Sequence, residues 1–303
     1  MTRSLIAVGL ACTLASPLFS QEIVGRDGSS FSVTESVAQG GWVRIASPNG
    51  FVRVTEGSGT RVEIRAEKDV RRASVTDVGF VVRREGNGVT VCAVYEGVDE
   101  CDEDGSYRGT SASRASSHNR QIRVNFTVQM PAGSRVRAST GNGEVQVTGG
   151  GPEVIAASGN GAITVSGAAG EVHAASGNGK VTVDGAGGPV EVSSGSGDIR
   201  VNTILGPVSA SSGNGTIEVS IDRLTGSPDM KFSTGNGRII LSVPDDFGAE
   251  LESNTGNGRV TVDFPILMQG RINPSRVRGT IGDGGGRLVM SSGNGNLEIR
   301  RRQ

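Results

Sequence analysis

Two cysteines carry the most definite chemistry in this sequence. Cys92 ends a stretch that alternates like a strand, and Cys101 follows it within an acidic segment. Arg3, the apolar stretch 5–14 and the small residues up to 20 have the layout of a secretory signal peptide, which predicts export after removal of residues 1–20. Two cysteines in a mature exported chain are generally paired. We predict a disulfide between Cys92 and Cys101, with two unlinked thiols as the alternative.

The third cysteine, Cys12, lies within the expected signal peptide. Ala11 is the small residue that precedes a lipoprotein cysteine, but Gly9 stands where an aliphatic residue is usual, so we do not expect lipidation. No later segment approaches the ~20 apolar residues of a membrane span. The sequence therefore predicts an exported protein of the periplasm, the outer surface or the medium, with no transmembrane segment.

The acidic segment contains a partial calcium-binding pattern. Glu100, Asp102, Asp104 and Gly105 match the opening of an EF-hand loop, but the twelfth position is Ser111 and no helix flanks the pattern. Elsewhere the two histidines, His118 and His173, stand far apart in the chain and suggest no zinc cluster or catalytic triad. We predict no catalytic residue, no metal and no cofactor.

The overall charge excludes one class of partner. A formal net charge of −1 gives no basic excess that could neutralise a phosphate backbone, so we expect no nucleic-acid binding. The Gly-x-Gly motifs do not predict a nucleotide loop either. The third glycine of a dinucleotide fingerprint would fall on Gln146 or Thr164, and no helix follows to bind a pyrophosphate.

The glycines instead mark an internal repeat. Gly-Asn-Gly begins at Gly141, Gly159, Gly177 and Gly213, with Gly-Ser-Gly at Gly195, so the period is 18 residues. Further copies begin at 235, 256 and 293, at intervals of 22, 21 and 37 residues. We interpret the longer intervals as loops inserted between successive coils of one stack.

Each repeat contains two short strands. Val and Ile alternate with polar residues after every Gly-Asn-Gly, and a second alternating stretch begins nine residues after the first of these apolar positions, as at Val145 and Val154. Strands that recur in phase without an intervening helix pair with their counterparts in the next coil. The sequence predicts an all-β fold, a parallel β-helix or β-solenoid with about 18-residue coils, right-handed by the crossover rule.

We divide the chain into three parts. Residues 1–20 are the signal peptide, 21–130 are an irregular β-rich N-terminal part, and 131–303 are the Gly-Asn-Gly solenoid with a C-terminal capping hairpin. Residues 96–121 are acidic and then serine-rich, with too little apolar content to pack, so we expect a mobile loop there.

The asparagines of the repeat are the remaining candidate residues. Identical amides that stack at one coil rise can bond to each other along a corner of the solenoid. We predict such a turn ladder, and the alternative is that asparagine is present only for its backbone freedom. The residues expected in the ladder are Asn142, Asn160, Asn178 and Asn214.

Three parts of the sequence resemble a known family. The segment Val124–Gly149, the repeated S-G-N-G-x-[IV]-x-V units and the ending Arg278–Ile299 are together similar to a bacterial family of β-strand-repeat domains labelled "putative adhesin". The segment Arg83–Cys92 is similar to a recurring feature of one branch of that family. The resemblance implies an exported β-helix-like fold, a closing Gly-rich hairpin over 278–299 and no known catalytic residues.

These observations favour a non-enzymatic scaffold or adhesive module of the cell envelope, with an unidentified protein or glycan partner. One alternative is an accessory subunit for envelope sensing that meets its partner through residues 96–121. Another is a polysaccharide-acting enzyme, which we do not expect because no aromatic residue lies between Val136 and Arg223 to stack on sugars.

Overall fold

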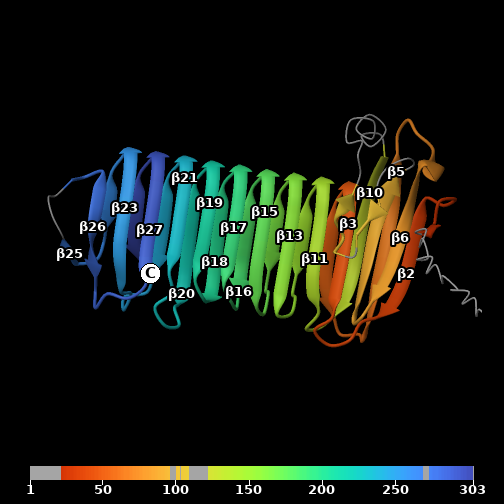
Figure 1. Ribbon diagram of the computed structural model, residues 1–303, viewed down its shortest axis with the longest axis horizontal. Coiled ribbons are helices and arrows are strands. Elements are labelled where there is room, and N and C mark those ends of the chain that lie inside the picture. Colours follow the sequence, from red (N-terminus) through yellow and green to blue (C-terminus); the bar gives the residue numbers. More distant parts are fainter. Residues whose placement is uncertain (1–21, 96–99, 103, 109–121, 269–272, 303) are drawn as a thin grey trace, which may run out of the picture.

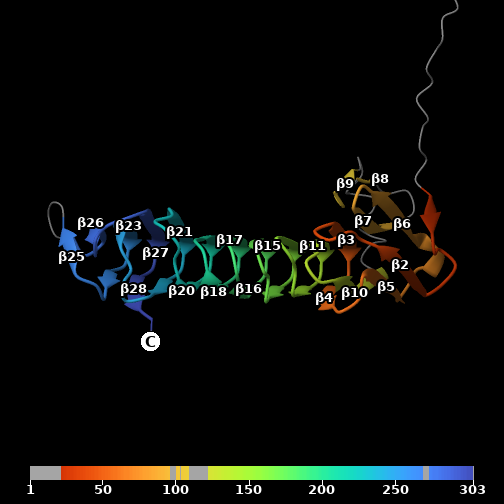
Figure 2. The ribbon, with the colours of Figure 1, turned by 90° about the horizontal axis from the view of Figure 1, so that it is seen from below.

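Two large sheets face each other along the length of the molecule (Figures 1 and 2). The computed structural model describes residues 22–95, 100–102, 104–108, 122–268 and 273–302. Within these ranges sheet A has 14 strands, sheet B has 12 and a small third sheet has two. No helix in the same ranges is both long and apolar enough to cross a membrane.

The strands of sheet A, in spatial order, are β1 (Ile23–Val24), β6 (Val78–Glu85), β7 (Gly88–Tyr95), β3 (Trp42–Asn49), β11 (Arg135–Asn142), β13 (Glu153–Asn160), β15 (Glu171–Asn178), β17 (Val190–Ser196), β19 (Val208–Asn214), β21 (Met230–Asn236), β27 (Arg287–Asn294), β23 (Ala249–Asn257), β26 (Arg276–Ile281) and β25 (Ile266–Met268). Those of sheet B are β2 (Ser30–Ser36), β5 (Arg61–Val70), β10 (Ile122–Pro131), β4 (Val52–Gly57), β12 (Val145–Thr148), β14 (Ile163–Ser166), β16 (Val181–Ala186), β18 (Ile199–Leu205), β20 (Ile217–Arg223), β22 (Ile239–Val243), β28 (Leu297–Arg301) and β24 (Val260–Val262). The third sheet pairs β8 (Glu100–Cys101) with β9 (Tyr107–Arg108), and one 3-10 helix, η1, spans Val75–Asp77.

The central coils have the predicted β-solenoid architecture. Each coil places one strand in each sheet, and each strand pairs in parallel with the equivalent strand of the next coil. Val145 lies opposite Ile163, which lies opposite Val181, so the apolar column continues from coil to coil. All the residues predicted to point inward from β12 to β20 are buried. The period-two alternation therefore identified the inner and outer faces correctly.

Side-chain size varies along the core. Valine, isoleucine and alanine fill the space between the sheets in the central coils, where an aromatic side chain would force the thin layers apart. Near the N-terminus the core contains Phe31, Phe80 and Phe126, whose rings contact each other in series at 4.5 and 5.9 Å between centroids. The N-terminal end is thus filled by aromatic residues that the central coils from β12 to β20 lack.

The N-terminal region is part of the same two-sheet body. Strand β3 pairs in parallel with β11 and β4 with β12, which places Asn49 opposite Asn142. Residues 47–50, Ser-Pro-Asn-Gly, occupy the positions of Ser-Gly-Asn-Gly in a repeat. The sequence predicted only irregular β structure here, because Pro48 replaces the first glycine of the motif. Both sheets continue through residue 130, so the division between residues 21–130 and 131–303 is not a boundary in the fold.

The C-terminal coils do not stack in chain order, and the prediction that they do is wrong. Strands β27 and β28, from the last Gly-Asn-Gly repeat, lie between the coil of β21 and β22 and the coil of β23 and β24. The chain end therefore lies inside the row of coils (Figure 1). The expected hairpin over 278–299 is also absent, because β23 separates β26 from β27. Instead the antiparallel pair β25 and β26 forms the end of sheet A.

Candidate functional site

The repeated asparagines lie at the corner where the coil strands of sheet A end. Asn160 Nδ2 donates to Asn142 Oδ1 at 2.9 Å, and Asn178 Nδ2 donates to Asn160 Oδ1 at 2.8 Å. Beyond Ser196 a second run of amide bonds joins, in spatial order, Asn214, Asn236, Asn294 and Asn257, at 2.6 to 2.8 Å. No side-chain hydrogen bond links Ser196 to either neighbouring asparagine among the residues described. The four asparagines singled out from the sequence thus lie in two separate runs.

A second ladder lies just inside the same corner. In the coils from residue 135 onward, the Ser or Thr directly before each Gly-Asn-Gly or Gly-Ser-Gly is buried, and it donates its hydroxyl to the carbonyl of the last glycine in the adjacent coil. Ser158 bonds Gly143 O at 2.9 Å, and Thr255 bonds Gly295 O at 2.8 Å. Sequence reasoning missed this role, although the repeated Ser or Thr before Gly-Asn-Gly was a visible signal. These bonds satisfy carbonyl groups that the sharp corner removes from the sheet ladder.

Glycine is required on both sides of the asparagine by close backbone approach. A Cβ at Gly159 would lie 2.5 Å from Gly141 O. A Cβ at Gly143, whose φ is +154°, would lie 2.1 Å from Gly50 O. The corner is therefore a rigid structural feature, with its exposed row of amides fixed at the spacing of the strands, about 4.8 Å.

One insertion interrupts this regular body. It follows Tyr95 at the end of β7 and returns at Ile122, where β10 begins. The Tyr95 hydroxyl donates to Ile122 O at 3.2 Å, so the two ends of the insertion are joined inside the core. Burial raises the pKa of Tyr95. Residues 96–99, 103 and 109–121 are outside the described part, and with them His118 and most of the predicted loop.

Part of the insertion packs as a hairpin, so the prediction of an unpacked loop is wrong there. Strands β8 and β9 lie outside the two-sheet body beside β7 (Figure 2). A disulfide joins Cys101 to Cys92 of β7, with their Cα atoms 6.3 Å apart. Both cysteines are buried together with Ala46, Val81 and Val94 on the outer side of sheet A, and Tyr107 packs against this cluster. The hairpin therefore covers an apolar patch that the sheet would otherwise expose.

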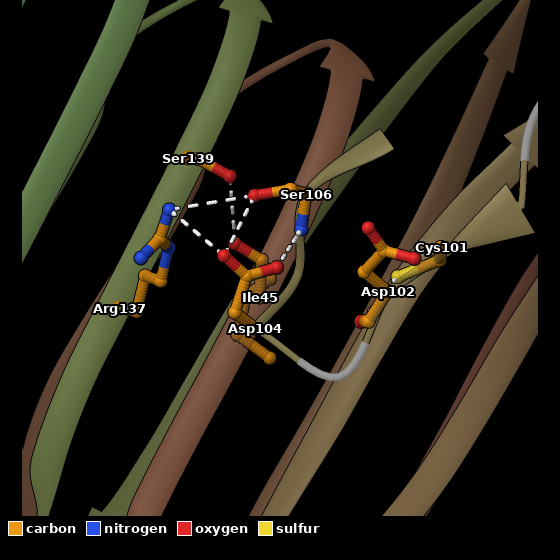
Figure 3. Close-up of polar contacts among 7 residues, drawn as sticks. All are labelled: Ile45, Cys101, Asp102, Asp104, Ser106, Arg137 and Ser139. Carbon is orange, nitrogen blue, oxygen red and sulfur yellow. Dashed lines mark hydrogen bonds and ion pairs between the residues drawn. The ribbon is translucent and has the colours of Figure 1, made fainter. Parts of the chain in front are cut away.

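The turn of the hairpin is fixed by polar contacts. Asp104 accepts hydrogen bonds from the Ser106 backbone N at 3.0 Å and from the Ser106 hydroxyl at 2.9 Å. The Arg137 guanidinium, on the outer face of β11, lies 3.6 Å from Asp104 Oδ2 and 3.5 Å from Ser106 Oγ (Figure 3). Tyr107 adds a hydrogen bond to Ala93 O at 2.9 Å. Apolar burial, a covalent bond and an ion pair thus hold the segment against the rod.

The electrostatics of Asp104 follow from these contacts. Partial burial raises the pKa of the carboxyl, but the hydrogen bonds from Ser106 and the charge of Arg137 outweigh burial and bring the pKa below its ordinary value. Arg137 was not singled out from the sequence. It is one arginine in a varied outward column, followed by Ile155 and His173 in the next coils, and nothing in that column signals a contact with residue 104.

The acidic residues and the histidine considered for metal binding lie apart from one another or contact other protein side chains. In the described ranges no group of three or more His, Cys, Asp and Glu side chains could hold a metal ion. The Asp104 carboxylate faces Ser106 and Arg137 (Figure 3). His173 lies on the outer face of β15, with Nε2 at 2.9 Å from Glu171 and Nδ1 at 3.3 Å from Glu191.

Fold and site together define a class of protein, a two-sheet parallel β-solenoid with one hairpin held on its side. The sequence model of the Toastrack DUF4097 family matches residues 97–300, and the chain belongs to that family. No curated protein matches the chain.

Several solved structures resemble it at low identity. A putative adhesin from Bacteroides fragilis is 11% identical, over 90% of this chain and 98% of the other, with a TM-score of 0.41. A putative adhesin from Parabacteroides distasonis is 13% identical over the same shares, with a TM-score of 0.42. A putative cell adhesion protein from Clostridium sporogenes is 9% identical, over 90% and 100%, with a TM-score of 0.24.

Proposed function

We propose that this protein is a non-enzymatic interaction module exported to the bacterial cell envelope, and that the disulfide-held hairpin is its contact element. The hairpin carries the proposal. It is a non-repeated segment held on the side of a regular rod, and Cys101, Tyr107 and Asp104 each attach it to a different group of the body. A contact element fixed in this way loses little conformational freedom when it binds.

The body of the protein suits a supporting role. Every central coil repeats the same buried Val or Ile columns and the same glycine corner, which makes the rod a regular and stiff support. Such an architecture presents a contact element at a fixed distance and orientation. Export is supported by the apolar stretch 5–14 and by the disulfide, because disulfides persist in oxidising compartments.

Capture from envelope extract tests the proposal. The immobilised mature protein is compared with two variants. Cys92→Ala/Cys101→Ala removes the covalent bond between the hairpin and the body, and Arg137→Glu reverses the charge that faces Asp104 at the hairpin turn. Arg200→Glu is the matched control, because Arg200 forms an ion pair with Glu218 on the outer face of sheet B, away from the hairpin.

We expect the same partner to be lost from both hairpin variants and kept by Arg200→Glu. Equal capture by all four proteins would show that the hairpin is not the contact element. The chemistry of the captured partner, a glycan or matrix protein as opposed to a membrane kinase or anti-sigma factor, separates an adhesive module from a sensing subunit.

A further inference from the structure

At the end of the rod opposite the hairpin, sheet A extends beyond sheet B through β26 and β25 (Figure 1). A polar cleft lies on this extension, between β23 and β26. Its cavity volume is about 470 Å³. Strand β23 contributes Glu252 and Asn254 to the lining, β26 contributes Arg276 and Arg278, and Asn273 lies just before β26. The proposed contact hairpin takes no part in this cleft.

Each oxygen of the carboxylate in the cleft accepts a short hydrogen bond from an arginine. Glu252 Oε1 accepts a hydrogen bond from Arg278 and Oε2 accepts one from Arg287, each at 2.6 Å. The hydrogen bonds from Arg287 and Arg278, together with their charges, hold the pKa of Glu252 below its ordinary value, so the group stays ionised. Both of its oxygens are therefore engaged by protein donors.

The amide oxygens are occupied as well. Asn273 Oδ1 accepts from the Ser275 backbone N and the Ser275 hydroxyl, both at 2.9 Å, which form a local turn. Asn254 Oδ1 faces Arg276 Nε at 3.5 Å. The Asn254 and Asn273 Nδ2 groups and the terminal nitrogens of Arg276 have no partner among the described residues. The side-chain acceptors named here thus each face a protein donor, whereas these donors remain available to a ligand.

A cleft with free donors and a surplus of arginine over carboxylate selects a ligand that is anionic and rich in acceptors. Arg276 can bind a carboxylate in two-point geometry, and the two amides suit hydroxyl and ring oxygens beside it. The volume lies within the range of small-ligand pockets, above what one simple anion fills. We propose that this cleft binds a carboxylate-bearing sugar unit of an acidic polysaccharide.

Titration calorimetry on the purified mature protein tests this. The probes are trigalacturonate, the neutral maltotriose and inorganic phosphate. The variant is Arg276→Gln, and the matched control is Arg200→Gln, which removes the same charge from the outer face of sheet B and so accounts for any general electrostatic attraction. Thermal unfolding checks that both variants are folded.

We expect trigalacturonate to bind at least tenfold more tightly than maltotriose, and Arg276→Gln to lose at least tenfold of that affinity while Arg200→Gln keeps it. Three results would each overturn the proposal. These are equal affinity for the two trisaccharides, an unchanged affinity in Arg276→Gln, and displacement of trigalacturonate by phosphate at similar concentration, which would indicate a simple anion site. Arg137→Glu should bind trigalacturonate like the wild type, so the test of the cleft does not depend on whether the hairpin is the contact element.

Discussion

At the scale of single residues, the corner ladder contains a natural gap. Ser196 lies between Asn178 and Asn214 in register, where asparagine would complete the row. A neutral hydrogen bond contributes about 0.5–1.5 kcal/mol net, and less when exposed. We expect Ser196→Asn to raise the free energy of unfolding by about 1 kcal/mol in urea titrations, with Ser196→Ala near neutral. A stability no higher in the asparagine variant than in the alanine variant would show that the amide bonds contribute nothing.

The inner face gives a second residue-scale prediction. Val183 is fully buried, whereas Lys180 in the same coil is exposed. Val183→Asp places an unpaired charge in a dry two-layer core, which lowers the free energy of unfolding by roughly 3 to 5 kcal/mol. We expect that variant to unfold in the central coils, as measured by circular dichroism melting, and Lys180→Ala to melt like the wild type. Similar melting temperatures would contradict the assignment of inner and outer faces.

At the scale of elements, the hairpin depends on its disulfide. The bond closes a short loop, and the chain-entropy account gives about 2 to 3 kcal/mol for a loop of this size. We expect Cys101→Ser to speed amide exchange in residues 100–108 while residues 135–223 keep their protection. Thiol labelling of the denatured, unreduced mature protein should find no free thiol. Two reactive thiols per chain would rule out the bond in solution.

The ion pair at the hairpin turn predicts a pH effect. The pKa of Asp104 is lowered in the folded protein, so its contribution is fully present above the unfolded value, about 3.9, and is lost as pH falls through the lower folded pKa. We expect the stability difference between wild type and Asp104→Asn to be constant at neutral pH and to shrink below about pH 4. In an Arg137→Gln background this pH dependence should weaken. An unchanged profile would mean that Arg137 does not influence the carboxylate.

At the scale of the whole molecule, the last coil of the chain lies between two other coils, so the C-terminal residues hold those coils together. Strands β27 and β28 join β21 and β22 to β23 and β24. In a stack of coils each unit is stabilised by its neighbours, so removing an internal unit separates the units on either side. Deleting residues 287–303 should therefore abolish exchange protection in residues 249–268 and leave 135–223 protected. Loss of only one end coil, with 249–268 still protected, would indicate stacking in chain order.

The sequence by itself determined the strands, their inner and outer faces and the corners of the central coils. In a repeat fold each residue packs against its counterparts in the adjacent coils, so a short periodic pattern contains nearly all the information that decides the contacts. The amide row followed from the same spacing. The hydroxyl ladder was equally predictable, because Ser or Thr recurs at one position in every repeat.

The tertiary structure alone decided which coils are neighbours and where the insertion packs. Gly-Asn-Gly at 86–88 shows why, because there it makes an antiparallel hairpin turn between β6 and β7 and not a solenoid corner. Likewise, β27 in the last coil matches its neighbours β21 and β23 in register, so the local pattern cannot fix the place of that coil in the row. The contact between Arg137 and Asp104 depends on the position in which the disulfide holds the hairpin, and the repeat pattern contains no information about that position.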